Sequence, residues 1–188
     1  MTLAVRRLRE SLRQDFFSLH SDANGCGLCQ CVAWWVPTWD GWADRSPAEN
    51  RALRESLFDQ GEYDGYLLYR DETPIGWAQV GRRDRLERLV REYALPADPS
   101  TWAITCFLLA PSARGQGLAQ RLLREVLADA PRQGASALEA FPRRGEGLSP
   151  EEVWTGTEGL FRRSGFSLVQ DHPRRPRYRR ELVPMGRV

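Results

Sequence analysis

The segment 101–130 most constrains the fold, because it joins a buried strand to an amphipathic helix through a glycine-rich turn. Residues 101–109 form a nearly continuous apolar run, which predicts a central strand covered on both faces. A turn with Gly115 and Gly117 follows, and apolar side chains then recur at helical spacing over 118–130. This order predicts an α/β fold with an anion-binding turn between strand and helix.

The anion site follows from the physics of a helix start. The first N–H groups of a helix have no partner within the helix, and the helix dipole places partial positive charge there. Two glycines leave the N–H groups of Gln116 to Ala119 open to a phosphate, and Arg114 adds a charge. The chain has neither the Gly-Lys-Ser/Thr of a nucleotide P-loop nor the Gly-x-Gly-x-x-Gly of a dinucleotide fold at this turn.

The other elements follow from periodicity, turns and caps. A capping box at Ser46 to Glu49 begins a helix, and the same signature recurs at Ser149 to Glu152, ahead of another predicted helix. Strands are predicted at 4–8, 65–69, 75–80, 136–141, 166–169 and 177–183, and helices at 12–20, 47–60, 83–93 and 157–163. The chain is therefore predicted to form a single α/β (α+β) domain over 1–188, with a mixed sheet flanked by helices.

Composition excludes several classes of protein. A hydrophobic fraction of 41% in 188 residues suits one domain with a real core. No apolar run approaches the roughly 18 residues of a membrane span, and the N-terminus lacks a signal-peptide pattern, so we expect a cytoplasmic protein. A net charge of +2 does not indicate a nucleic-acid binder, although all 27 basic residues are arginine.

A Cys- and Trp-rich segment, 21–45, is predicted to be an irregular insertion. It holds three cysteines, with a histidine just before it: His20, Cys26, Cys29 and Cys31. These are either a zinc site or local thiols, and we predict no metal because the spacing is not a standard zinc pattern. Its tryptophans either line an acceptor pocket or pack in the core: Trp34, Trp35, Trp39 and Trp42. Cys106, in a predicted central strand, is expected to be inert.

The glycine-rich turn resembles a known family. Arg114, Gly117 and Ala119 match the Arg/Gln-x-x-Gly-x-Gly/Ala motif of the GNAT superfamily of N-acetyltransferases. The segment 160–166 resembles that family's helix-to-strand segment ending in Gly-Phe, and the order of elements over 4–182 fits. Four further short segments resemble a bacterial, mostly uncharacterised GNAT subgroup with a Cys- and Trp-rich N-terminal region. They are Cys31 to Trp35, Asn50-Arg51, Gly76-Trp77 and Cys106-Phe107.

The resemblance implies a cofactor, acetyl-CoA or a related acyl-CoA, and a set of residues that hold it. The pyrophosphate would lie on Arg114, Gly115, Gln116, Gly117, Leu118 and Ala119. The pantetheine arm would pair with the strand through Phe107, Leu108 and Leu109, which splays away from the strand 136–141. A backbone N–H near Phe107 or Leu108 would stabilise the oxyanion while an amine attacks the acyl group directly.

The sequence offers one candidate residue for proton transfer. Glu139 lies in a strand beside the predicted cleft and is the candidate general base; the alternative is that it faces solvent. The family often has a tyrosine general acid four residues before the glycine of Gly-Phe, where this chain has Phe161. Phe161 is therefore assigned to cofactor binding, and another group must reprotonate the thiolate, or the thiolate leaves unaided.

An arginine-rich tail ends the chain, with Arg174, Arg175, Arg177, Arg179 and Arg180. It is predicted to be a terminal strand with solvated arginines; the alternatives are contact with RNA, an acidic substrate or the 3′-phosphate of the cofactor. The predicted function is N-acetylation of a primary amine of a small molecule or peptide, with no nucleic acid or membrane partner and with a homodimer possible. The alternatives are a non-catalytic acyl-CoA sensor and a zinc- or thiol-dependent regulatory module.

Overall fold

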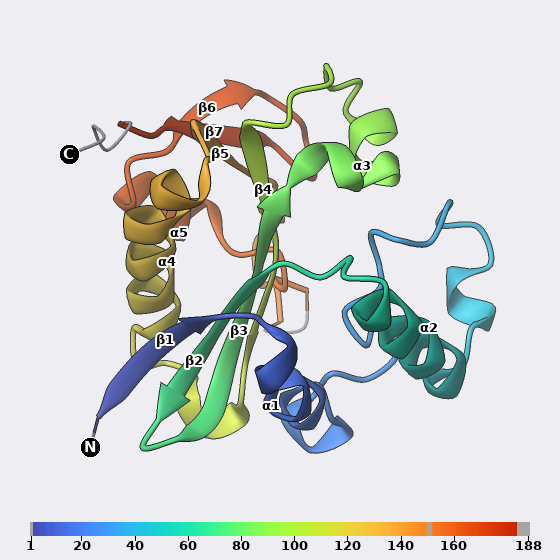
Figure 1. Cartoon of the computed structure of the whole chain (residues 1–188). Helices are drawn as coiled ribbons and strands as arrows, with labels where there is room; N and C mark the ends of the chain where they lie inside the picture. The colour runs from blue at the N-terminus through green and yellow to red at the C-terminus, as the bar shows by residue number, and fades with distance from the viewer. Residues whose placement is uncertain (1, 150–151, 184–188) are drawn as a thin grey trace.

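Seven strands form one mixed sheet in the computed structural model, which describes residues 2–149 and 152–183 (Figure 1). The order across the sheet is β1-β2-β3-β4-β5-β7-β6. The strands are β1 (Leu3–Arg7), β2 (Gly65–Arg70), β3 (Thr73–Arg82), β4 (Thr101–Leu109), β5 (Ala137–Ala140), β6 (Ser167–Gln170) and β7 (Arg177–Glu181). The predicted mixed sheet flanked by helices is confirmed.

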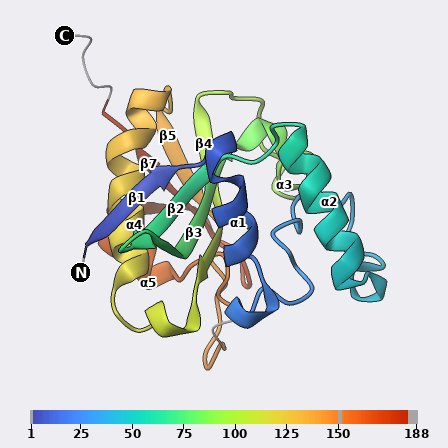
Figure 2. The same cartoon turned by 60° about the horizontal axis from the view of Figure 1, so that its bottom comes forward.

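Helices cover both faces of this sheet (Figures 1 and 2). They are α1 (Arg13–Leu19), α2 (Pro47–Asp59), α3 (Glu87–Glu92), α4 (Leu118–Asp129) and α5 (Glu158–Arg163). One core cluster joins α4 and α5 to the sheet through side chains such as Leu122 and Phe161. A second core cluster lies on the other face, where Phe16 of α1 and Phe58 of α2 pack with Trp77 of β3.

The central strands β4 and β5 separate as they leave the middle of the sheet. They are the one parallel pair in the described sheet, and their pairing runs only from Thr101–Ala137 to Ile104–Ala140. Beyond Ile104, β4 continues to Leu109 without β5 beside it. The register between β3 and β4 also shifts after Gln79, which adds a bulge near the same point. The predicted splay is thus present, and it opens one edge of β4.

Local signals explain most element boundaries. The Ser46 Oγ accepts the Glu49 N–H at 3.2 Å and the Glu49 carboxylate accepts the Ser46 N–H at 2.6 Å, so the first capping box forms as predicted. The second lies partly outside the described residues, at 150–151, and residues 152–155 form turns. α5 begins later, where Thr157 Oγ1 accepts the Leu160 N–H at 3.2 Å.

One predicted helix is wrong in extent. The segment 83–93 forms a 3-10 turn over Arg83–Arg85 and only then α3, because Leu86 leaves the helical region with φ −101° and ψ 76°. The side chain of Arg83 is buried and meets Glu139 of the inner strand β5 at 2.7 Å.

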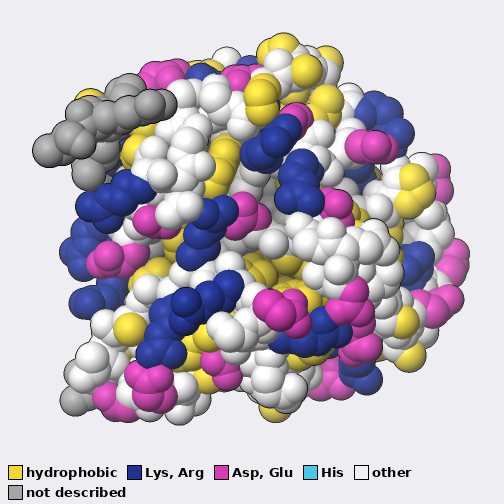
Figure 3. All heavy atoms as spheres, viewed as in Figure 1, with side chains coloured by type: hydrophobic (Ala, Val, Ile, Leu, Met, Phe, Trp, Pro, Cys, Tyr) yellow, Lys and Arg dark blue, Asp and Glu magenta, His cyan; other side chains and the backbone are white. Residues whose placement is uncertain are grey.

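The surface carries both charges. On the face in Figure 3, basic and acidic side chains are interspersed, and apolar side chains are visible in the hollow near its centre. Within the described residues, no helix combines the length and apolarity that a membrane crossing requires.

Candidate active-site cleft

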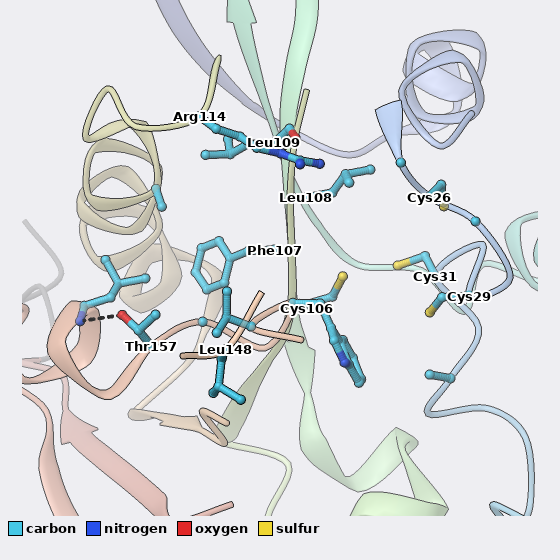
Figure 4. Close-up of a pocket in the computed structure, with 18 of the residues that line it drawn as sticks. Cys26, Cys29, Cys31, Cys106, Phe107, Leu108, Leu109, Arg114, Leu148 and Thr157 are labelled. Carbon is cyan, nitrogen blue, oxygen red and sulfur yellow. Dashed lines mark hydrogen bonds between the residues drawn. The ribbon is translucent and has the colours of Figure 1, made fainter. Parts of the chain in front are cut away.

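A cleft of about 920 Å³ opens beside the free edge of β4. Along this strand, side chains alternate between the two faces of the sheet. Phe107 and Leu109 pack with the core under α4, whereas Cys106 and Leu108 pack with the core under α1. All four line the cleft, so it passes from one face of the sheet to the other through the splay (Figure 4).

The backbone of β4 offers hydrogen-bonding groups to this cleft. The Ala110 N–H donates to Ile75 O of β3 at 2.9 Å. By the alternation of an antiparallel pair, the N–H of Leu108 also faces β3, and those of Phe107 and Leu109 face the open side. The Phe107 N–H donates to Trp154 O at 2.6 Å. Of the two predicted oxyanion donors, Leu108 thus faces away and Phe107 is hydrogen-bonded to the turn at 152–156.

The glycine-rich turn has the conformation that an anion site needs. Gly115 and Gly117 have φ values of +72° and +71°, in the left-handed region that favours glycine. Gly117 is the N-cap of α4, and no side chain caps this helix. A Cβ built on either glycine would meet nothing within 4 Å, and both glycines line the cleft, so the start of α4 borders open space. The turn therefore fits a pyrophosphate group.

The other residues predicted to hold the pyrophosphate divide by position. Arg114 lines the cleft, and its Nε donates to Leu109 O at 3.0 Å, so the guanidinium also fixes the end of β4. Ala119 lines the cleft as well. The Gln116 side chain lies outside it, bonded to Arg70 at 2.7 Å, and Leu118 is buried in the core. Gln116 and Leu118 therefore contribute no side chain to the cleft lining.

Phe161 has a structural place rather than a place in the cleft lining. Its ring is fully buried and packs against Phe107 and Phe166, with ring centroids 6.2 and 5.3 Å away. Gly156 has a φ of +86°, and a Cβ there would lie 2.8 Å from the Phe161 ring. Phe161 therefore packs beneath Gly156 in the turn at 152–156, and its predicted role in direct cofactor contact is wrong, because its ring does not line the cleft.

Glu139 does not face the cleft, which corrects its assignment as the general base. Its side chain is 1% exposed, and three guanidinium groups surround its carboxylate. Arg83 lies 2.7 Å away, Arg179 of the neighbouring β7 lies 3.1 Å away, and Arg177 lies 3.2 Å away. Strand periodicity could not fix its facing, and these partners make it a structural ion-pair centre. Two arginines of the tail are thus internal partners rather than solvated groups.

Aromatic side chains and one further arginine form another part of the lining. Trp39, Trp42 and Trp154 line the cleft, and the guanidinium of Arg175 stacks over Trp154 at 5.3 Å. Trp34 lies in the core instead, with 2% of its surface exposed. The tryptophans of the 21–45 segment are therefore divided between the cleft lining and the core. Trp154 was not singled out from sequence, because it lies about a hundred residues further along the chain.

Four cysteines and His20 line the same cleft (Figure 4). Burial raises the pKa of Cys26 to about 12 and that of Cys29 to about 11, so both are thiols at neutral pH. Across the described residues, no group of three or more His, Cys, Asp or Glu side chains could hold a metal ion. The zinc alternative therefore has no geometric support in this part of the chain.

Comparisons with known proteins agree with this geometry. The model of the acetyltransferase (GNAT) family matches residues 28–145. A putative acetyltransferase of the GNAT family from Desulfovibrio desulfuricans has a similar fold, with a TM-score of 0.61 and 18% identity over 97% of this chain and 100% of that chain. Identity at this level shows the fold alone.

Two further solved structures contain acetyl-CoA. A putative acetyltransferase from Salmonella typhimurium, solved with its cofactor acetyl-CoA, has a TM-score of 0.57 and 15% identity over 98% of this chain and 96% of that chain. A phosphinothricin acetyltransferase from Sinorhizobium meliloti, in complex with acetyl-CoA, has a TM-score of 0.54 and 20% identity over 97% and 89%. Curated proteins gave no significant match.

The family match covers more than half of the chain, and it includes β4, the glycine-rich turn and α4. These are the elements that form the open helix start and the free strand edge of the cleft. The chain belongs to the GNAT acetyltransferase family and is an acyl-CoA-dependent acetyltransferase.

Proposed function

We propose that this protein transfers an acetyl group from acetyl-CoA to a primary amine of a small molecule or peptide. The observation that carries the proposal is the uncapped start of α4 beside the free edge of β4, within a single cleft. The open N–H groups at Gly117 to Ala119 suit the pyrophosphate, and the Leu109 N–H suits an amide of the pantetheine arm. The acetyl-CoA in the Salmonella and Sinorhizobium structures supports this choice of cofactor.

In this proposal, residues of the chain bind acetyl-CoA and orient it. Acetyl-CoA supplies an activated acyl group when bound. The α4 dipole favours the negative charge of the pyrophosphate, and the glycines allow close approach. The free edge of β4 aligns the arm, so that its end reaches the part of the cleft lined by Cys106 and Leu108. Oriented binding of this kind lowers the barrier without a proton transfer by Glu139 or Phe161.

We propose that the acceptor binds where aromatic side chains and Arg175 line the cleft. Arg175 has no carboxylate partner within salt-bridge distance among the described residues, and burial lowers its pKa. Its Nη1 donates to Thr155 Oγ1 at 3.4 Å. A half-buried guanidinium without an acidic partner favours an anionic ligand. The acceptor amine is therefore expected to carry a carboxylate as well, with the tryptophans contacting its apolar part.

The pyrophosphate assignment is tested by one substitution with a matched control. Gly117→Glu places a bulky anion at the start of α4 and should weaken CoA binding at least about tenfold. Gly134→Glu is the control, because Gly134 also has a positive φ, +96°, with nothing within 4 Å of its Cβ position, but lies outside the cleft lining. Both variants place a glutamate at a positive φ, so calorimetric CoA binding separates the effect of a strained backbone from the effect of the site. Equal affinities for the two variants would contradict the assignment.

The reaction is tested by release of free thiol from acetyl-CoA with a panel of amines. The panel pairs each amine that bears a carboxylate with an analogue that lacks it. We expect turnover with the carboxylate-bearing members, and Arg175→Gln should raise KM for these more than for their analogues. Binding of CoA without turnover on any member would instead support the acyl-CoA sensor. The cytoplasmic location and the homodimer stay predictions.

A further inference from the structure

Three tryptophans from distant parts of the chain form a continuous aromatic surface in the cleft. Trp39, Trp42 and Trp154 line the cleft, and we call them the tryptophan wall. The rings of Trp39 and Trp42 meet edge to face, with centroids 5.8 Å apart. The buried Trp34 ring joins the two ends of the wall, since its centroid lies 6.0 Å from that of Trp39 and 6.1 Å from that of Trp154.

The exposed ring of this wall is held in a fixed position. The Trp39 Nε1–H donates to Glu92 Oε2 at 3.4 Å, and the guanidinium of Arg88 covers one face of the ring. Arg88 is itself fixed, because it is buried and donates to Ala33 O at 2.8 Å and Val36 O at 3.3 Å. Trp39 is nevertheless 39% exposed. A rigid aromatic surface of this kind loses little entropy when an apolar ring packs on it.

The tryptophan wall is attached to β4 at the place where the acyl group arrives. The Trp34 Nε1–H donates to Thr105 O at 3.3 Å, and Trp154 O accepts the Phe107 N–H at 2.6 Å. Both contacts lie on the part of β4 that extends beyond its pairing with β5. They flank Cys106, the part of the cleft to which the proposed function assigns the end of the arm (Figure 4). An acceptor on this wall therefore lies next to the acyl carbon.

The groups suited to an amine and to a carboxylate lie one residue apart. A carbonyl oxygen has two lone pairs, so Trp154 O can accept an amine N–H in addition to the Phe107 N–H. The Arg175 guanidinium lies 5.3 Å from the Trp154 ring, and its Nη1 donates to Thr155 Oγ1 at 3.4 Å. Neighbouring Cα atoms are about 3.8 Å apart. An amine and a carboxylate on the same carbon fit this short spacing, whereas those at the two ends of a peptide do not.

We propose that the acceptor is a free α-amino acid with an aromatic side chain. Its carboxylate pairs with Arg175, its amine lies beside Trp154 O, and its ring packs on Trp39 and Trp42. The inference rests on the proposed function, because it names the acceptor of the same acetyl-CoA site. The amine attacks the acyl carbon directly: the carbon–nitrogen bond forms, the bond from that carbon to the CoA sulfur breaks, and the proton lost by nitrogen balances the one gained by the CoA thiolate.

The test measures release of free thiol from acetyl-CoA by the whole wild-type chain. The best substrate among phenylalanine, tyrosine and tryptophan is compared with leucine, which lacks the ring and should have a kcat/KM about tenfold lower. The amide of the same aromatic amino acid lacks the carboxylate, and its dipeptide with glycine and its β-amino acid analogue displace the carboxylate. Each of these three should have a kcat/KM at least about tenfold lower.

Two pairs of variants assign the contacts. Trp39→Leu should bring the kcat/KM ratio of the aromatic amino acid over leucine close to one, and Trp35→Leu should retain the ratio, because Trp35 lies outside the cleft lining. Arg175→Gln should lower the ratio of the amino acid over its amide by at least about tenfold, and Arg174→Gln, at an exposed neighbour outside the lining, should retain it. Each ratio compares two substrates of one variant, so a smaller folded fraction leaves it unchanged.

The outcomes separate this inference from the proposed function. Turnover of leucine or of amines without a carboxylate at rates equal to or above those of the aromatic amino acids would overturn the inference and leave acetyl transfer standing. Equal rates for the amino acid and its dipeptide would do the same, since a peptide terminus would then be an acceptor. Binding of acetyl-CoA without turnover of any amine would overturn the proposed function itself.

Discussion

Glu139 carries its charge inside the sheet, where only 1% of its side chain is exposed. Its register partner across the β5–β7 pair is Arg179, and Arg83 approaches from the segment before α3. Replacing both members of such a pair by apolar groups is often neutral, but removing one leaves buried charge without a partner. The three arginines make this carboxylate necessary for the packing of β5 against β7.

Glu139→Gln is therefore expected to destabilise the fold rather than to alter the reaction. The free energy of unfolding should fall by about 3–5 kcal/mol, as is typical when one partner of a buried pair is lost. Denaturant unfolding measures this, and Glu72→Gln, which removes a 78% exposed partner of Arg6, is the control with little expected change. A stable Glu139→Gln protein with a lower rate and a displaced pH profile would instead restore Glu139 as a base.

Local sequence determines the conformation of some of these residues but not the surroundings of others. Gly115 and Gly117 could be placed at an anion site, because a positive φ and an open helix start depend on local sequence. The facing of Glu139 depends on which strand lies beside β5, and that strand is β7, some forty residues later. The placement of Cys31 and His20 in the lining of one cleft depends on how the 21–45 segment packs on α1, which no periodicity encodes.

At the scale of elements, a single carboxylate adds polar contacts to the buried side chains that hold α5 to the sheet. Glu158, in the first turn of α5, accepts a hydrogen bond from the Tyr178 OH of β7 at 2.7 Å. Arg144, in the loop after β5, donates to both oxygens of the same carboxylate at 2.9 and 3.0 Å. These contacts join three segments around the end of α5 that contributes Leu160 to the cleft lining.

The hydrogen bonds of Glu158 give a pH dependence of stability. The Arg144 guanidinium, aided by Tyr178 and opposed by partial burial, lowers the pKa of Glu158 to about 2 from its ordinary value of 4.5. A carboxylate with a lowered folded pKa stabilises the fold fully above its unfolded pKa, and this stabilisation is lost as the pH falls from about 4.5 to about 2. Glu158→Gln should therefore cost about 2 kcal/mol at pH 7 and progressively less below pH 4.5.

Thermal unfolding at several pH values tests this. The melting temperatures of the wild type and Glu158→Gln should converge toward pH 2, and Asp171→Asn, which removes a 73% exposed partner of the same Arg144, should have a smaller effect. A difference between wild type and Glu158→Gln that persists unchanged at low pH would show that the side chain acts through packing.

Element types were predictable where one signal dominated. The apolar run of β4 and the amphipathic pattern of α4 produced the predicted boundaries within a residue, and the proline-containing capping box fixed the start of α2. The turn at 152–156 was not predictable as a part of the site. Its Trp154 carbonyl takes the Phe107 N–H, a contact between segments almost fifty residues apart that only the completed fold brings together.

At the scale of the molecule, the cleft divides the sheet into two parts. β1 to β4 form one part and β5, β7 and β6 the other, and pairing between them is limited to the four residue pairs of β4 and β5. The cleft lining includes β4 and the α4 start as well as Thr157 and Leu160, which belong to the region of α5. A ligand that fills the cleft therefore contacts elements on both sides of the splay.

Ligand binding should consequently stabilise the whole fold, because CoA binds the folded state and not the unfolded chain. At a hundred times the dissociation constant, binding contributes about 2.7 kcal/mol. For a chain of this length, that raises the melting temperature by about 5–10 °C. ADP carries the pyrophosphate but no pantetheine arm, so it reaches the α4 start without pairing to β4 and should bind more weakly. At equal concentration it should give a clearly smaller shift.

Thermal unfolding with CoA and with ADP, repeated on the two glycine variants, shows which parts of the cleft bind each ligand. Gly117→Glu should reduce the shift by both ligands, because both need the open N–H groups of α4, and Gly134→Glu should retain it. Equal shifts by CoA and ADP at saturation would mean that the arm gains nothing from the free edge of β4. In that case the Trp154 carbonyl, which bonds to the Phe107 N–H at 2.6 Å, stays in place when the cofactor binds.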